Sequence, residues 1–346
     1  MIIYSLLYLF SIGLMLSFFT FQYKLNKSAS LVFELLFIII FSIILSQRNI
    51  LDSPDTNDYF QFFNSINFTN FNIYRFEIGF KVYTLIFKIL INDFRIYLFS
   101  FPFLFSLLFL VIIRKSIKLN PGLIYLIVLL AYFGIYYSGI VIRQSIALAL
   151  VSLVIVNYFN NGKLKINDLF IIFISIIFHN SALIIIPIFL ISMIKIKEKF
   201  IFTILVVLVY FIDLGRSVMP PLLSYLESIF QNSYYINYFS RFEWNGSISL
   251  WSILIMLLLL YVSLSFKKGK FNEKLFSVVF FGGFLYSLFR SIPIVERIAE
   301  YFIVFLLLLI FKIIESKSII YKVVVTYSLT FIFMYISIRI LIPSLR

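Results

Sequence analysis

Four stretches of the sequence place charged or polar residues within or beside long apolar runs, where hydrocarbon disfavours them. The first begins with Arg143 and Gln144, which follow Ser138 and Gly139 and open the apolar run IRQSIALAL. Small residues in this run allow close helix packing, so we expect Arg143 to face the interior of a helix bundle. Its planar guanidinium suits bidentate binding of phosphate. An arginine that only snorkels to the headgroup level is the alternative.

The second stretch contains His179, the only histidine, followed by Asn180 and Ser181 and flanked by apolar runs. A helix that runs from Asp168 reaches His179 after about 17 Å, short of the full membrane thickness. Polar residues at such a helix break line cavities in transporters. The histidine could act there as a general base or bind a substrate hydroxyl, and a structural hydrogen bond is the alternative.

The third stretch surrounds a proline-marked turn and contains Arg290, Glu296, Arg297 and Glu300. Glu296 and Glu300 share a helix face because they are four residues apart. Two arginines near a helix start could clamp a pyrophosphate, whereas pairing of arginine with glutamate across the turn is the alternative.

The fourth stretch holds Asp52, Asp55 and Asp58 around Pro54. Acids at this spacing could bind a divalent cation, but we favour the alternative that they cap the following helix.

The absence of cysteine and the single histidine exclude thiolate sites and zinc cages. No Walker, GxGxxG, HExxH or GxSxG motif occurs, so nucleotide-driven and protease chemistry have no support.

The composition indicates which elements carry these residues. Of the 346 residues, 62% are hydrophobic and only 13% are charged, whereas soluble domains are near half apolar and a quarter charged. This excludes a cytosolic globular enzyme. The net charge of +14 indicates, in a membrane protein, cytoplasmic anchoring loops and an anionic, lipid-borne partner in place of nucleic acid.

We therefore predict an all-α, polytopic membrane protein with about 10–12 transmembrane helices in a single domain over residues 1–346. The long, mostly apolar runs that predict spans are 2–21, 31–46, 95–113, 121–138, 139–159, 249–266, 275–291, 297–312 and 319–340. Shorter candidates are 168–178, 181–194 and 200–214. Residues 168–194 could instead form one span, and we favour two because Lys195, Lys197 and Lys199 then stay inside.

Residues 77–91 form a different kind of helix. Glu77, Lys81, Thr84 and Lys88 lie within about 60° of one another around its axis, as a narrow polar stripe on an apolar helix. This predicts an interfacial helix on the outer leaflet, within an extracytoplasmic loop over residues 47–94. We expect a second long extracytoplasmic loop over residues 215–248.

Lysine and arginine are distributed differently along the chain. If the N-terminus lies outside, 16 of the 18 lysines fall in cytoplasmic loops, as the positive-inside rule expects. Ten of the 11 arginines fall at the outer side or near outer helix ends. Because arginine suits bidentate binding, this outer face indicates a site for an anionic, phosphorylated substrate.

Five segments resemble, in the same order over about residues 50–305, the EpsG family of Wzy-type polysaccharide polymerases: SPDTNDYFQFF, RFEIGFKVY, IRQSIALAL, FHNSALIIIP and VERIAEYF. The resemblance implies a multi-pass enzyme of the bacterial inner (cytoplasmic) membrane, with its active site facing the periplasm or outside. It implies glycosyl transfer that joins polyprenyl pyrophosphate-linked oligosaccharide repeat units into O-antigen, capsule or exopolysaccharide. By this resemblance the residues to test are Glu77, Arg143, His179, Glu296 and Arg297.

Such a glycosyltransferase needs neither nucleotide nor metal, since the donor carries its leaving group and guanidinium groups can neutralise it. No cofactor is expected. The roles that we assign are Arg143, Arg290 and Arg297 for the pyrophosphate, His179 or Glu296 for the base, and Glu77 and Asp55 for the acceptor glycan. Expected partners are the lipid-linked oligosaccharide, membrane lipids and a chain-length regulator protein, with no nucleic acid.

Other functions stay open. A lipid-linked oligosaccharide flippase would show internal repeats and charges through the full membrane depth, whereas the inner halves of these spans are nearly free of charge. An O-antigen ligase or a membrane acyltransferase would share the outer site and the single histidine.

Overall fold

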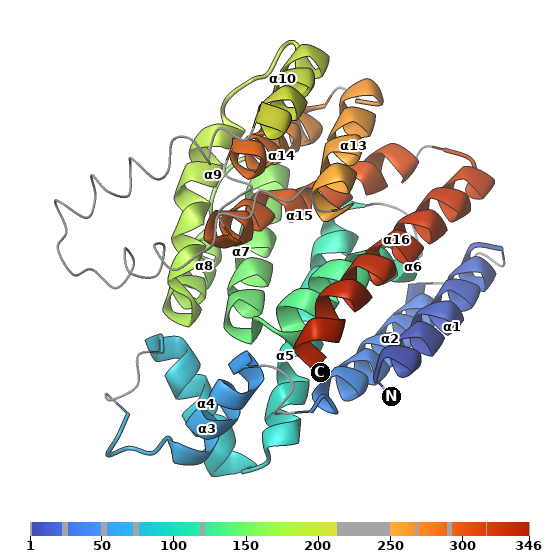
Figure 1. The fold of residues 1–346 in the computed structure, drawn as a ribbon. Coiled ribbons are helices and arrows are strands. Elements are labelled where there is room, and N and C mark those ends of the chain that lie inside the picture. The colour runs from blue at the N-terminus through green and yellow to red at the C-terminus, as the bar shows by residue number, and fades with distance from the viewer. Residues whose placement is uncertain are drawn as a thin grey trace, which may run out of the picture. The chain divides into compact units, whose positions relative to one another are not determined.

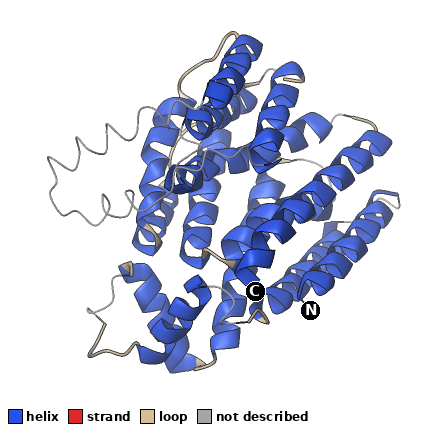
Figure 2. Cartoon of the chain, viewed as in Figure 1, coloured by secondary structure: helices blue, strands red, loops and turns tan. Residues whose placement is uncertain are grey.

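In its described parts, the computed structural model is built from helices (Figures 1 and 2). It describes residues 2–22, 27–49, 54–71, 76–117, 122–212, 250–266, 269–288, 293–315 and 317–345. Within these ranges there is no strand, which confirms the predicted all-α, polytopic membrane fold. The predicted loop 215–248 lies outside the described residues.

The chain divides into two compact units, the first formed by Met1–Ile185 with Ile314–Arg346 and the second by Ile186–Ile313. The helices of the first unit are α1 (Ile2–Gln22), α2 (Lys27–Ser46), α3 (Pro54–Ser65), α4 (Ile78–Leu90), α5 (Phe94–Ser116), α6 (Gly122–Leu129), the π-helix η1 (Leu130–Ser138), α7 (Ile142–Asn161), α8 (Ile166–Phe178), the 3₁₀-helix η2 (Asn180–Ile184) and α16 (Ile319–Leu345). Those of the second are α9 (Ile185–Ser192), α10 (Lys199–Ile212), α13 (Leu250–Leu264), α14 (Lys270–Leu288) and α15 (Pro293–Glu315).

The predicted spans coincide with these helices because an apolar run of this length can satisfy its backbone in hydrocarbon only as a helix. Among the described residues, four stretches are long and apolar enough to cross a membrane: Ser28–Ser46, Phe94–Ser116, Ile142–Asn161 and Ile320–Ile338. Further apolar helices are shorter, at 10–17 residues. The run 168–194 is interrupted, since α8 ends at Phe178 and η2 begins at Asn180.

Helices α7 and α8 form an antiparallel hairpin. Gly162 follows α7 in the left-handed conformation, at φ 74°, which terminates that helix and reverses the chain. At the start of α8, Asp168 accepts a hydrogen bond from the backbone N–H of Lys165 at 2.9 Å and another from the Asn157 amide at 2.8 Å. Because the hairpin is anchored at this end, the start of α7 and the end of α8 lie at its other end.

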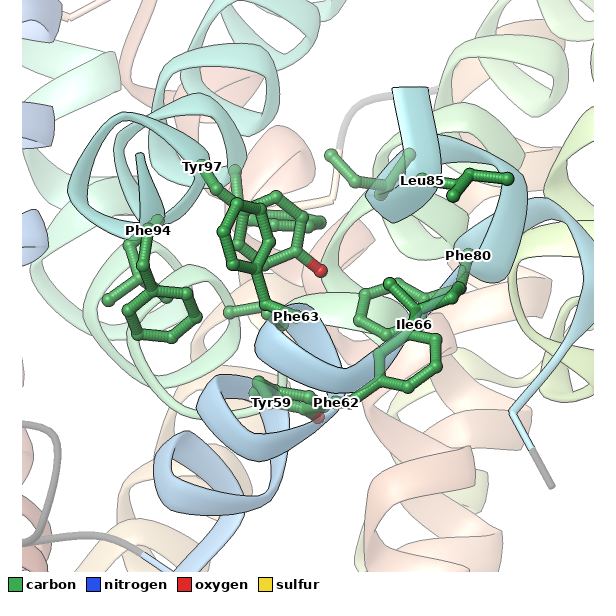
Figure 3. Packing of buried hydrophobic residues seen from close by; sticks show 12 residues of the cluster. Tyr59, Phe62, Phe63, Ile66, Phe80, Leu85, Phe94 and Tyr97 are labelled. Carbon is green, nitrogen blue, oxygen red and sulfur yellow. The ribbon is translucent and has the colours of Figure 1, made fainter. Parts of the chain in front are cut away.

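An aromatic cluster holds α3, α4 and the start of α7 against α5 (Figure 3). Tyr59, Phe62 and Phe63 of α3, with Ile66 directly after it, follow the spacing of one helix face and are 0–3% exposed. The other buried members are Phe80 and Leu85 of α4, Phe94, Tyr97, Leu98 and Phe101 of α5, and Ile142 and Ile146 of α7. This packing fixes the position of α4 relative to α3, α5 and the start of α7.

The polar stripe of α4 faces the protein. The Thr84 hydroxyl lies 2.9 Å from the hydroxyl of Tyr97, and Lys81 lies 4.9 Å from the ring centre of Phe71. The opposite face is apolar and exposed, and its members are Ile78, Val82, Ile86 and Ile89, at 44–58% exposure. The helix is therefore amphipathic, with its apolar side turned away from the rest of the first unit.

Candidate functional site

Glu77, Arg143 and His179 meet in the first unit although 66 and 102 residues separate Glu77 from the other two. One carboxylate oxygen of Glu77, Oε2, accepts a hydrogen bond from Arg143 Nη1 at 2.5 Å. The other, Oε1, lies 2.7 Å from His179 Nδ1. We call these three residues the Glu–Arg–His cluster. Their side chains are 12%, 26% and 22% exposed, so the cluster is sheltered but accessible.

The position of Glu77 depends on a close approach between α4 and α8. Glu77 is the residue that precedes α4, and Gly79 follows in its first turn. A Cβ on Gly79 would lie 2.9 Å from the backbone carbon and oxygen of Ile177, which is closer than real Cβ contacts. Only glycine lets the start of α4 lie this near the end of α8, two residues before His179.

His179 occupies the break between α8 and η2 that the sequence predicts. Its backbone is extended, with φ −159° and ψ 124°. Its N–H donates to the Ser175 carbonyl at 3.0 Å, and its own carbonyl accepts from the N–H of Ala182 at 2.9 Å. These two bonds hold the break from both sides, so the imidazole projects from a fixed backbone.

Arg143 lies in the first turn of α7 and is seated on aromatic rings. Its guanidinium carbon is 4.8 Å from the ring centre of Phe76, 5.8 Å from that of Phe80 and 6.0 Å from that of Tyr59. Guanidinium groups bind favourably over aromatic faces. The side chain therefore contacts protein, which favours the predicted interior position over a snorkelling arginine. Its Nε is buried without a hydrogen-bond partner.

The surroundings of Glu77 keep its carboxylate ionised. Burial raises its pKa, but the hydrogen bond from His179 and the positive charge of Arg143 lower it more, to a final value of about 2. An ionised carboxylate can only accept hydrogen bonds, so Nδ1 of His179 carries the proton in the Glu77 contact. In the neutral imidazole, Nε2 is then left as the proton acceptor.

The other residues predicted for the site are placed as follows. Asp55 lies in the first turn of α3, where an acid favours the start of a helix. Asp52 and Arg290 lie outside the described residues, as do the side chains of Glu296 and Arg297 in the first turns of α15. Within the part of the chain that the structure describes, no three potential ligands gather to hold a metal ion.

Two of the arginines predicted at the outer side form hydrogen bonds near the end of α2. Arg95 Nη1 donates to the carbonyls of Ser46 at 2.8 Å and Arg48 at 2.5 Å, where α2 ends. Arg48 donates to Thr56 Oγ1 at 3.2 Å, and burial lowers its pKa to about 10. Cationic donors commonly satisfy the free carbonyls at a helix C-terminus. Some of the arginines predicted at the outer side therefore stabilise the fold and are not available to bind a substrate.

The sequence interpretation missed the residues that seat the cluster. Phe76, Gly79 and Phe80 lie close to Glu77 in the segment RFEIGFKVY, and Tyr59 belongs to α3. Aromatic and glycine residues are common in a chain with 20% aromatic content, so their types alone carry little signal. The one usable clue was a glycine in the first turn of a predicted helix, two residues after an acid.

Replacing Gly79 with alanine should destabilise the first unit by about 1–3 kcal/mol, because the new methyl group overlaps backbone that cannot rotate away. The unfolding transition of purified protein in detergent measures this. The matched control is Gly139→Ala, where the nearest atom to a new Cβ is 3.8 Å away. Equal transitions for the two variants would contradict the close approach of α4 and α8.

Comparison with known proteins agrees with this architecture. The chain matches the family model described as the EpsG family over residues 31–344. No curated protein and no solved structure matches it. The family match spans nearly all of the 346 residues, and EpsG-like proteins are Wzy-type polymerases. This protein belongs to the EpsG family.

Proposed function

We propose that this protein is a membrane glycosyltransferase that joins polyprenyl pyrophosphate-linked oligosaccharide repeat units into a polysaccharide. Membership of the EpsG family supports a role of the polysaccharide-polymerase type in general. The observation that carries the finer proposal is the contact of Glu77 with Nδ1 of His179, because it leaves Nε2 to accept a proton. The reaction needs such a base, since an acceptor hydroxyl is a weak nucleophile.

The proposed step runs as follows. Nε2 of His179 takes the proton of an acceptor sugar hydroxyl as the hydroxyl oxygen attacks the anomeric carbon of the donor sugar. A new glycosidic bond forms, and the bond from the anomeric carbon to the phosphate oxygen breaks. The polyprenyl pyrophosphate leaves with the bonding electron pair. The imidazolium that forms is stabilised by the carboxylate of Glu77 at 2.7 Å.

Glu77 has a different role here from the acceptor-binding role predicted for it. Both of its oxygens are engaged, one by Arg143 and one by His179. We therefore assign it as a positioning residue that sets the tautomer of His179. The exposed part of the Arg143 guanidinium is left to neutralise the departing phosphate, and Arg290 and Arg297 remain proposed partners for the pyrophosphate.

We also propose that the cluster lies at the extracytoplasmic face of the bacterial inner membrane. The exposed apolar face of α4 supports this, since such a helix can lie in the outer leaflet with Ile78, Val82 and Ile86 toward lipid. The loop after α7, which holds Lys163 and Lys165, lies at the other end of the hairpin from Arg143, as the positive-inside rule requires.

Single cysteines in this cysteine-free chain test the orientation. In intact cells, a membrane-impermeant thiol reagent should label Asp58→Cys on α3, whereas it should label Lys163→Cys only after permeabilisation. Both positions are exposed. Labelling of Lys163→Cys in intact cells would overturn the proposed orientation.

Deletion of the gene separates polymerase, ligase and flippase, because each acts at a different step. Without the polymerase, a host that makes O-antigen should carry core capped with a single repeat unit, and the intact gene should restore long chains. In a host that makes capsule or exopolysaccharide, high-mass polymer should disappear while the lipid-linked single repeat remains. Long lipid-linked chains that are not transferred would identify a ligase, and the absence of any external repeat would identify a flippase.

A further inference from the structure

The second unit contains an apolar cavity that the proposed reaction does not use. Its volume is about 430 Å³, and its apolar walls include Ile191, Ile194, Phe202, Phe280 and Phe281. This volume lies within the range of about 300–1,000 Å³ that is typical of small-molecule sites. All of the lining residues belong to the second unit, so the cavity is formed within one compact body.

The walls of this cavity are joined by specific contacts. The Ser277 hydroxyl of α14 donates to the Ile194 carbonyl at 2.6 Å, which ties α14 to the chain that follows α9. The rings of Phe202 on α10 and Phe280 on α14 pack edge to face at 5.9 Å. Because the hydroxyl of Ser277 is hydrogen-bonded to protein, the interior of the cavity suits an apolar ligand.

Two lysines also line the cavity, in the loop between α9 and α10. Lys195 and Lys197 are exposed, and neither forms a salt bridge within the part of the chain that the structure describes. Lys199 is used differently, since its Nζ donates to the Ile196 carbonyl at 2.9 Å and lies 4.4 Å from the ring centre of Phe266. The one acid of this loop, Glu198, is exposed and lies between Lys197 and Lys199 in the sequence.

We propose that the cavity binds one acyl chain of an anionic phospholipid, whose phosphate is held by Lys195 and Lys197. The apolar walls suit a hydrocarbon chain, and ammonium groups bind phosphate as compact charges. The loop joins two apolar helices, α9 and α10, and carries several lysines, a pattern typical of loops at the cytoplasmic headgroup level. Basic pockets at such depths bind anionic lipid headgroups.

Quenching of a tryptophan by brominated lipid tests this site. The reporter is Phe202→Trp, in a background in which Trp244→Phe and Trp251→Phe remove the native tryptophans. In vesicles of unbrominated phosphatidylcholine, acyl-brominated phosphatidylglycerol should quench the reporter at a lower mole fraction than acyl-brominated phosphatidylcholine. A preference of about fivefold is expected for each lysine that contacts the phosphate.

The double variant Lys195→Gln and Lys197→Gln should bring the two quenching curves together. The matched control replaces Lys163 and Lys165 with glutamine, which removes two exposed lysines from another loop and should leave the preference unchanged. A reporter at Leu208→Trp, on the exposed face of α10, should show no headgroup preference. Equal quenching of Phe202→Trp by both lipids, or a preference that survives the double variant, would overturn the proposal. The readout does not involve polymer synthesis, so it stands apart from the proposed function.

Discussion

Replacing His179 with glutamine is expected to lower polymer synthesis about 100-fold or more, because glutamine keeps a hydrogen bond but cannot accept the proton. The measurement is the rate at which purified, reconstituted protein extends lipid-linked repeat units. The variant should insert normally, since the backbone of His179 is held by the Ser175 carbonyl and the Ala182 N–H, which the substitution leaves in place. Retained activity would move the role of base to Glu296.

Replacing Glu77 with glutamine distinguishes a positioning role from a substrate-binding one. If Glu77 orients His179, kcat should fall and its pH dependence should change, while KM for the lipid-linked acceptor stays close to that of the unmodified protein. If Glu77 instead binds the acceptor, KM should rise with kcat unchanged. Because the pKa of Glu77 is about 2, its own titration does not contribute to the pH profile near neutrality.

Replacing Arg143 with lysine is expected to remove most activity, about 10- to 100-fold, although the charge is kept. An ammonium group cannot pair with Glu77, lie flat on Phe76 and present further donors at the same time. The measurement is the same extension assay, together with a check of insertion and thermal unfolding. We expect Arg297→Lys to behave in the same way if it holds the pyrophosphate.

Arg95→Lys is the matched control for Arg143→Lys. Arg95 donates to two backbone carbonyls at the end of α2, a contact that an ammonium group can reproduce. Its activity should therefore remain close to that of the unmodified protein. Near-normal activity of Arg143→Lys would mean that this arginine serves only as the ion-pair partner of Glu77.

Much of the helical framework can be predicted from the sequence. The long apolar runs predict helices because hydrocarbon offers the backbone no other hydrogen-bond partner, and the described helices coincide with them. The break at His179 is also foreseen, since polar residues interrupt two apolar runs there. Helix ends are less predictable, as with α2, which begins at Lys27 although the predicted span begins only at residue 31.

The surroundings of the polar stripe on α4 could not be predicted from periodicity. A stripe at helical spacing places Lys81, Thr84 and Lys88 on one face, but it does not say whether water or protein covers that face. In the fold the stripe contacts Tyr97 and the backbone after α3, where Lys88 donates to the Ile66 carbonyl at 2.9 Å. Hydrogen bonds within the protein thus engage this polar stripe.

The sequence by itself determined the membrane class and the helical elements, because composition and hydrophobic runs can be read without the fold. It also predicted candidate site residues, but not which of them meet. Only the tertiary structure decided that Glu77 lies between Arg143 and His179. That meeting depends on the fit of Gly79 against Ile177 and on the aromatic cluster that seats α4 against α5 and α7. Such contacts join segments up to 102 residues apart, and their register follows from side-chain packing, which no local pattern encodes.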